Sequence, residues 1–137
     1  MTAKEYFQKI GLLNSMIRAK LMYINTLRDT LSISAPPTDN ELISHTRNVH
    51  ALADRVAMVM DAEKEADEMI DEMVDLRRRV VAAINQMDDL SQATFITARY
   101  LEGKTTKEIA QEHHYSVRWI EQRISDGMDK LTEILGA

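Results

Sequence analysis

The chain has 137 residues, two prolines, four glycines, nine methionines and a formal net charge of −5, which suits an all-α protein of one domain or two small ones. The lack of cysteine excludes disulfides, thiolate nucleophiles and cysteine metal sites, and it is compatible with a reducing cytoplasm. We expect a cytoplasmic protein without a signal peptide or membrane span, because no apolar run approaches the roughly 20 residues that a span needs.

A first long helix is predicted from Thr2, with Glu5 at capping-box spacing. Apolar side chains then recur at steps of three and four residues, a near-heptad stripe that is typical of a helix packed on another helix. The stripe consists of Tyr6, Ile10, Leu13, Ile17, Leu21, Ile24, Leu27 and Leu31. Pro36 and Pro37 cannot continue a helix, so residues 32–40 are predicted to be a loop. The next residues, 41–50, permit either a short helix or a loop.

A second long helix is predicted over residues 51–87, with an apolar stripe that Glu63 and Arg77 interrupt. The stripe consists of Leu52, Val56, Val59, Ala66, Ile70, Met73, Val80, Ile84 and Met87. The two long helices are predicted to pair as an antiparallel, coiled-coil-like hairpin. A remaining apolar flank could bind a second copy of the chain and form a homodimer. This flank consists of Leu12, Met16, Val74 and Val81.

The last third of the chain has the spacing of a helix-turn-helix. Leu90, Ser91 and Phe95 have hydrophobic-staple spacing, so a helix is predicted with Ser91 as its N-cap. Gly103 closes this helix. Its expected core residues are Ile96, Tyr100 and Leu101.

Two further helices are predicted after Gly103. Thr105 and Glu108 have capping-box spacing for a short helix, whose buried stripe is Ile109, Ala110 and His113. Ser116 is the N-cap candidate of a longer helix. The apolar stripe of that helix is Ile120, Ile124, Met128, Leu131 and Leu135. The alternative interpretation is three ordinary core helices joined by short turns.

Several of these residues together resemble region four of sigma-70-type factors, which docks on the −35 promoter element. They are Arg99-Tyr100-Leu101-Glu102-Gly103, Thr105, Glu108-Ile109-Ala110, Ser116 and Ile120. With its long helical N-terminal part, the whole chain resembles small phage-encoded regulators of late transcription of the RinA/ArpU type. His113 and His114 stand where the sigma pattern has a leucine and a turn glycine. Histidine is enriched at positive φ, so His114 is predicted to adopt the left-handed conformation.

The resemblance implies two domains and a regulatory function. We expect a helical hairpin over residues 1–88, with a loop near residues 32–50, followed by a helix-turn-helix DNA-binding domain over residues 89–137. The expected function is that of a phage or prophage late-gene activator, with double-stranded DNA and RNA polymerase as candidate partners. The chain has no room for the sigma domain that melts the −10 element, so an accessory factor is expected rather than a complete sigma factor.

The start of the last helix is the candidate reading surface, because the second helix of a helix-turn-helix lies in the major groove. The expected base-contacting residues are Ser116, Val117, Arg118, Trp119 and Gln122. Arg118 can pair with guanine, Gln122 with adenine, and Val117 can touch a thymine methyl group. The resemblance also implies a base-contacting glutamine at Gln122. Contact with DNA, contact with a protein partner or partial burial could each explain Trp119. The candidate phosphate contacts are Lys104, Lys107 and Arg123.

The charge balance keeps a second function class open. Residues 89–137 contain six Lys or Arg and eight Asp or Glu, so weak non-specific DNA affinity is expected. This acidic balance favours the alternative of a non-enzymatic assembly or packaging adaptor that binds proteins through its helical hairpin. No catalytic motif is present, and the adjacent side chains of His113 and His114 diverge on a helix. We therefore expect no enzyme activity, metal site or cofactor.

Overall fold

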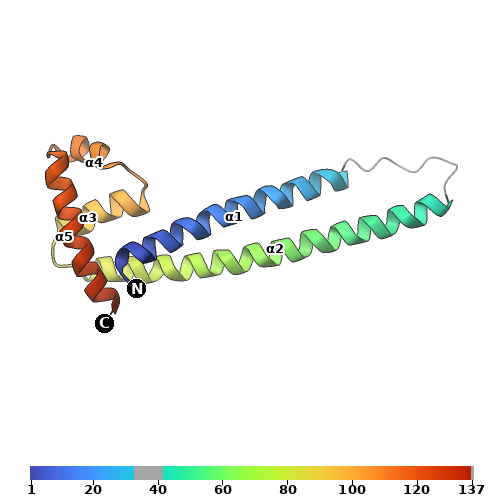
Figure 1. The fold of residues 1–137 in the computed structure, drawn as a ribbon, viewed down its shortest axis with the longest axis horizontal. Coiled ribbons are helices and arrows are strands. Elements are labelled where there is room, and N and C mark those ends of the chain that lie inside the picture. Colours follow the sequence, from blue (N-terminus) through green and yellow to red (C-terminus); the bar gives the residue numbers. More distant parts are fainter. Residues whose placement is uncertain (33–41, 137) are drawn as a thin grey trace. The chain divides into compact units, whose positions relative to one another are not determined.

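The computed structural model describes residues 1–32 and 42–136, and every regular element in these ranges is a helix (Figure 1). The elements are α1 (Ala3–Ser32), α2 (Leu42–Asn85), α3 (Leu90–Ile96), the π-helical turn η1 (Thr97–Leu101), α4 (Thr106–His113) and α5 (Val117–Gly136). The predicted all-α fold is therefore confirmed. Residues 33–40 of the predicted loop lie outside the described part of the chain.

The chain forms two compact units, and each long helix contributes to both. One unit consists of Leu12–Met73, and the other of Met1–Gly11 together with Val74–Ala137. The boundary that the sequence suggested between residues 88 and 89 stays a prediction.

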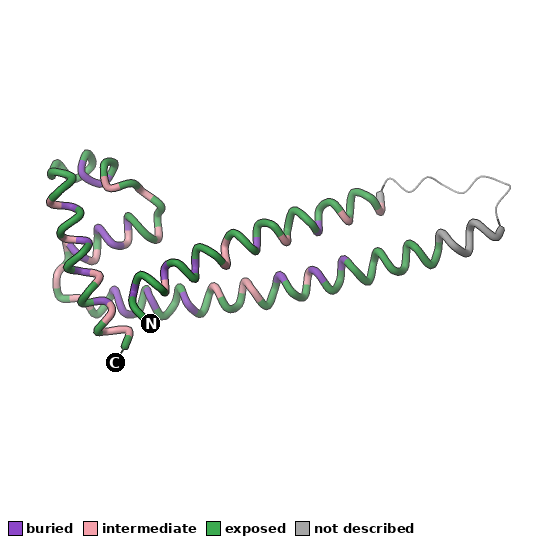
Figure 2. The backbone as a smooth tube through the Cα atoms, in the orientation of Figure 1, coloured by how far each residue is buried: buried purple, intermediate pink, exposed green. Residues whose placement is uncertain are grey.

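In the unit Leu12–Met73, α1 and α2 lie side by side and run antiparallel (Figure 1). Their shared core contains Ile24, Val59, Ala62 and Ala66, with Leu27 and Leu31 packed against it. Ion pairs join the helices between Lys20 and Glu65 and between Arg28 and Glu63. Buried residues recur at intervals along both helices (Figure 2), as the predicted hairpin requires.

The predicted stripe of α1 needs two corrections. Ile10, Ile17 and Ile24 are buried as expected. Leu21, however, is exposed, and Lys20 beside it reaches Glu65. Because the buried isoleucines repeat every seven residues, the intervening seam position falls on residue 20 and not on residue 21. At the start of the helix, Phe7 is buried, whereas Tyr6 is only half-buried, because Phe7 packs on Tyr100.

Helix α2 begins at Leu42, so residues 42–50 are helical. The stripe prediction is confirmed at Val59, Ala66, Val80 and Ile84 and is wrong at Leu52 and Val56, which are exposed. Val59 already packs with the last turns of α1, and nothing described on α1 remains to cover the earlier turns of α2. The pattern also missed three buried residues, which are Ala62, Leu76 and Ala83.

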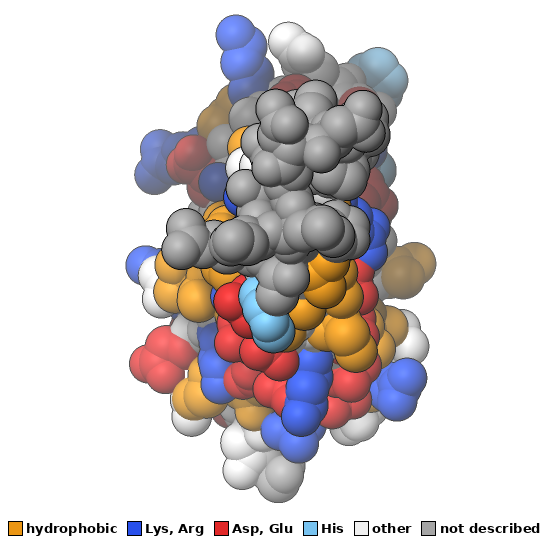
Figure 3. Space-filling view, turned by 90° about the vertical axis from the view of Figure 1, so that its right-hand side faces the viewer, with side chains coloured by type: hydrophobic (Ala, Val, Ile, Leu, Met, Phe, Trp, Pro, Cys, Tyr) orange, Lys and Arg blue, Asp and Glu red, His pale blue; other side chains and the backbone are white. Residues whose placement is uncertain are grey.

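Both long helices carry exposed apolar side chains outside the seam. Leu12 and Met16 on α1 and Val74 and Val81 on α2 are all exposed, as the predicted flank requires. In the view from the end of the hairpin, exposed hydrophobic side chains lie beside many Asp and Glu side chains (Figure 3). None of the helices in the described residues is both long and apolar enough to cross a membrane.

In the unit Met1–Gly11 and Val74–Ala137, the first turns of α1 pack against the C-terminal helices. The Thr2 hydroxyl accepts a hydrogen bond from the Glu5 amide at 3.2 Å, as the predicted N-cap requires. Ala3 is fully buried, and its amide donates to the Thr132 hydroxyl of α5 at 2.9 Å. The Phe7 ring stacks on Tyr100 with 4.5 Å between ring centroids.

Candidate nucleic-acid interface

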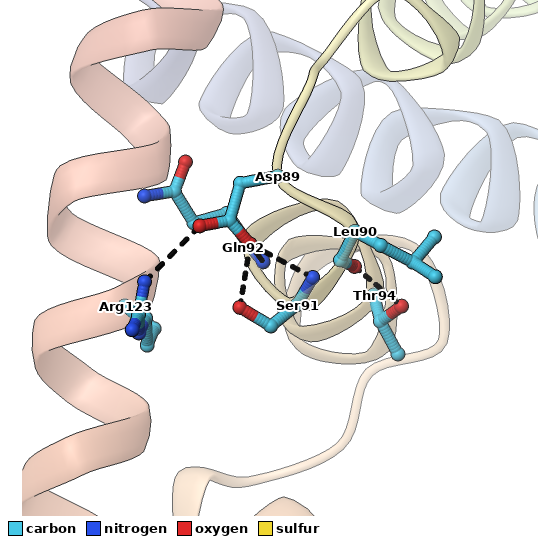
Figure 4. Close-up of polar contacts among 6 residues, drawn as sticks. All are labelled: Asp89, Leu90, Ser91, Gln92, Thr94 and Arg123. Carbon is cyan, nitrogen blue, oxygen red and sulfur yellow. Dashed lines mark hydrogen bonds and ion pairs between the residues drawn. The ribbon is translucent and has the colours of Figure 1, made fainter.

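Helix α3 begins with an aspartate as its N-cap. Oδ1 of Asp89 accepts hydrogen bonds from the Ser91 amide at 2.9 Å, the Gln92 amide at 3.2 Å and the Ser91 hydroxyl at 2.6 Å (Figure 4). The prediction of Ser91 as the N-cap is wrong because this carboxylate satisfies the free backbone donors of the first turn. Leu90 is 80% exposed, so the predicted hydrophobic staple does not form either.

The turn η1 continues α3 with wider π-helical hydrogen bonding. The Glu102 amide donates to the Thr97 carbonyl at 3.0 Å, and Gly103 then ends the helix at φ 74°, as predicted. The additional residue in this turn rotates the side chains that follow. The predicted core is therefore confirmed only at Ile96, because Tyr100 lies 36% exposed. Leu101 is half-buried, and the other buried residues of α3 and η1 are Gln92, Phe95 and Ala98.

The predicted turn between the two helices of the motif is confirmed. The Thr105 hydroxyl accepts from the Glu108 amide at 3.1 Å and caps α4. His114 adopts the left-handed conformation, with φ 61° and ψ 40°, and its amide donates to the Ala110 carbonyl. Ala110 is buried with Ile109. His113 is exposed, so its predicted place in the buried stripe is wrong.

Helix α5 packs its predicted stripe against α3 and α4. The Ser116 hydroxyl accepts from the Trp119 amide at 3.2 Å, which confirms Ser116 as the N-cap. Ile120, Ile124 and Leu131 are buried, and Met128 and Leu135 are half-buried. Gly127 is also buried, and a Cβ atom there would lie 2.7 Å from Cδ1 of Ile96 on α3. Apolar periodicity does not predict this contact, although a glycine in the middle of a helical pattern is a signal of close packing.

Four of the five predicted base-contacting residues lie exposed at the N-terminal end of α5. Ser116, Val117, Arg118 and Gln122 are all exposed. Within the described residues, Arg118 and Gln122 have no ion-pair or hydrogen-bond partner. Both side chains are therefore available to an external partner.

The fifth predicted residue, Trp119, packs within the domain. Its ring stacks on Tyr115, with 4.1 Å between centroids, and meets the edge of Phe95 at 5.6 Å. Trp119 is half-buried. Of the three explanations that the sequence left open for Trp119, the structure shows partial burial.

Two of the three candidate phosphate contacts already have carboxylate partners. Nζ of Lys104 lies 3.0 Å from Glu112 and 3.1 Å from Glu102, and these two carboxylates raise the pKa of the lysine above its ordinary value. Arg123 lies 3.1 Å from Asp89. Lys107 is exposed and has no such partner in the described part of the chain.

A cavity of about 580 Å³ lies beside α5, in the same unit. Two cationic side chains, Lys4 and Arg99, and two carboxylates, Glu121 and Asp129, line it. These charges balance, so they do not favour an anionic ligand such as phosphate. Among the described residues, no group of three or more His, Asp or Glu side chains could hold a metal ion.

The C-terminal helices correspond to a known protein family. Residues 83–133, from the end of α2 through most of α5, match the family model of Sigma-70, region 4. No curated protein and no solved structure matches the chain. Sigma-70 region 4 is a family of DNA-binding rather than enzymatic domains. The capped α4, the left-handed turn at His114 and the capped α5 therefore form a C-terminal helix-turn-helix domain of the sigma-70 region-four type.

Proposed function

We propose that the protein is a sequence-specific transcriptional regulator that reads double-stranded DNA with the start of α5. The observation that carries the proposal is the match of residues 83–133 to Sigma-70, region 4. The geometry supports it, since the N-cap of Ser116 opens a helix whose exposed surface bears Arg118 and Gln122. This is the part of a helix-turn-helix that enters the major groove.

The proposed contacts follow from the chemistry of each side chain. Arg118 pairs with a guanine, Gln122 with an adenine, and Val117 touches a thymine methyl group. Ser116 and the exposed part of Trp119 complete the base-contacting set. Lys107, an exposed cation at the start of α4 without a carboxylate partner in the described residues, contacts a phosphate.

We further propose that the protein acts in the cytoplasm as a late-gene activator of a phage or prophage, beside RNA polymerase. The resemblance of the whole chain to regulators of the RinA/ArpU type supports this setting. Residues 89–137 are net acidic, so a second copy or the polymerase supplies part of the affinity. The exposed apolar residues on the long helices, Leu12 and Met16 among them, are the proposed contact surface of a homodimer.

A binding titration on DNA selected from a random pool tests the reading surface at two salt concentrations. Arg118→Ala is expected to lose roughly 1–3 kcal/mol of specific binding and to relax the preference at one base pair. Lys107→Ala is expected to weaken all sequences alike and to reduce the slope of log affinity against log salt by about 1.

Lys130→Ala is the matched control, because this exposed lysine lies toward the other end of α5. It should leave the base preference unchanged. A folded wild-type protein that shows no sequence preference, alone or with RNA polymerase, would remove the DNA-reading function. The assembly or packaging adaptor would then be the better interpretation.

A further inference from the structure

The carboxylate of Asp89 joins two helices of the C-terminal domain. Oδ1 accepts the hydrogen bonds that cap α3, whereas Oδ2 lies 3.1 Å from Nη1 of Arg123 on α5 (Figure 4). Both oxygens are thus engaged, and Asp89 and Arg123 are each about one-third exposed. The hydrogen bonds from Ser91 and Gln92, together with the charge of Arg123, keep the pKa of Asp89 below its ordinary value.

Arg123 makes a second contact, with the aromatic cluster at the turn. Its guanidinium carbon lies 4.9 Å from the ring centroid of Trp119, which is a cation–π distance. Trp119 in turn stacks on Tyr115, directly before the N-cap of α5, and meets Phe95 of α3. Asp89, Arg123 and Trp119, which we call the bracket, therefore connect the start of α3 to the start of α5.

The bracket lies next to the proposed reading surface on the same turns of α5. Trp119 and Arg123 are four residues apart and form one row on the helix. Arg118 and Gln122, each one residue earlier, form the adjacent row. Any rotation of α5 that changed the direction of Arg118 would also have to break the contacts of Arg123 with Asp89 and Trp119.

We propose that Asp89 and Arg123 are positioning residues that fix the rotation of α5 on α3, and that Arg123 is not a phosphate contact. A guanidinium that turned away to a DNA phosphate would lose its contacts with the carboxylate and the ring. The proposal replaces the phosphate role that the sequence suggested for Arg123. Its DNA-binding consequence rests on the proposed function, whereas the bracket itself can be tested without DNA.

Asp89→Asn separates the two roles, because they predict effects of opposite sign. Asparagine is also a favourable N-cap, so the variant keeps the cap of α3 and removes the charge that holds Arg123. If Arg123 is a positioning residue, the ratio of specific to non-specific affinity falls several-fold and the salt slope does not rise beyond that of the control. If Arg123 is a phosphate contact restrained by Asp89, its release strengthens binding to all sequences and steepens the slope by about 1.

The matched control is Asp126→Asn, an exposed carboxylate of α5 with no partner among the described residues. It changes the net charge equally and should leave the ratio unchanged. Arg123→Met supplies the reciprocal variant. A positioning role predicts a lower ratio with an unchanged salt slope, whereas a slope reduced by about 1 with an intact base preference would overturn the proposal.

The fluorescence of Trp119 tests the bracket without DNA, because this is the only tryptophan of the chain. Asp89→Asn and Arg123→Met should each shift its emission maximum, and the double variant should add little to either change. Asp126→Asn should leave the emission unchanged. Unaltered emission in both single variants, or additive losses of melting temperature, would refute the bracket. If the fluorescence and melting results agree with the bracket but the wild type binds no DNA, the bracket stands and only the proposed function is refuted.

Discussion

Gly127 shows how a single residue sets the distance between α3 and α5. A Cβ atom at this position would lie 2.7 Å from Cδ1 of Ile96 and 2.9 Å from Cβ of Gln92. The end of the isoleucine side chain can move, but Cβ of Gln92 is attached to the backbone of α3. The helices can therefore keep their close approach only with glycine at this crossing.

Gly127→Ala is expected to destabilise the protein by about 1–3 kcal/mol, because the cost of overpacking exceeds the helix propensity that alanine gains. Urea unfolding measures the difference. Gly11→Ala is the control, since no atom lies within 4 Å of the added Cβ in α1. That variant should be about 0.5–1 kcal/mol more stable than the wild type. Equal stabilisation by both substitutions would contradict the close crossing.

Asp89 makes the stability of the domain depend on acid pH. Its pKa is lowered in the folded chain from an ordinary value of 3.8, so the folded state favours the ionised carboxylate. This contribution is fully present above the ordinary pKa, and it is lost as the pH falls through the lower folded value. The melting temperature of Asp89→Asn should therefore lie below that of the wild type by a constant difference at pH 5–7. The difference should shrink below about pH 4, and a constant difference down to pH 2 would contradict the assignment.

At the scale of elements, locally encoded features could be predicted and long-range ones could not. The caps of α4 and α5 follow from hydroxyl residues at fixed spacing, so Thr105 and Ser116 were identified correctly. The cap of α3 was missed because two acceptors, Asp89 and Ser91, stand close together and the carboxylate accepts the bonds. The π-helical turn has no residue signature that marks it in advance.

In the candidate site, too, local features could be predicted from the sequence and long-range contacts could not. The exposed face of Arg118 and Gln122 could be derived from helical periodicity alone, because it needs only the inward direction of Ile120 and Ile124. The engagement of Arg123 by Asp89 could not be derived in this way. These two residues come from different helices, and only the packing of α3 on α5 brings them together.

The helical hairpin yields a prediction with neighbouring residues as test and control. Ile17→Asp should lower the free energy of unfolding by several kcal/mol, because Ile17 is buried and an unpaired carboxylate there loses its hydration. Ser15→Asp should have little effect, since Ser15 is exposed. Thermal unfolding followed by circular dichroism compares them. Similar melting temperatures in the two variants would contradict the packing of Ile17 between α1 and α2.

At the scale of the whole molecule, one compact unit is built from both ends of the chain. The amide of Ala3 meets the hydroxyl of Thr132 at 2.9 Å, and Phe7 stacks on Tyr100. The start of α1 therefore completes the core on which α5 packs. Residues far from the helix-turn-helix in sequence thus contribute to its stability.

Phe7→Ala is accordingly expected to destabilise the helix-turn-helix by roughly 3 kcal/mol, because it removes a buried ring. Hydrogen exchange of the buried amides of α5 reports this loss directly. Gln8→Ala serves as the control, because Gln8 is exposed on the same turns of α1 and the change should be nearly neutral. Unchanged exchange in α5 of the Phe7 variant would show that the helix-turn-helix is stable without the start of α1.

The contact between Ala3 and Thr132 also bears on how the protein is made. During translation, the first turns of α1 leave the ribosome long before α5 has been synthesised, so the partners that bury Ala3 and Phe7 do not yet exist. The closing contact joins residues 129 positions apart, and it can form only after most of the chain has emerged. The unit Leu12–Met73, whose residues are consecutive, can assemble earlier. The C-terminal helix-turn-helix domain is thus the part of the nascent chain that completes its folding last.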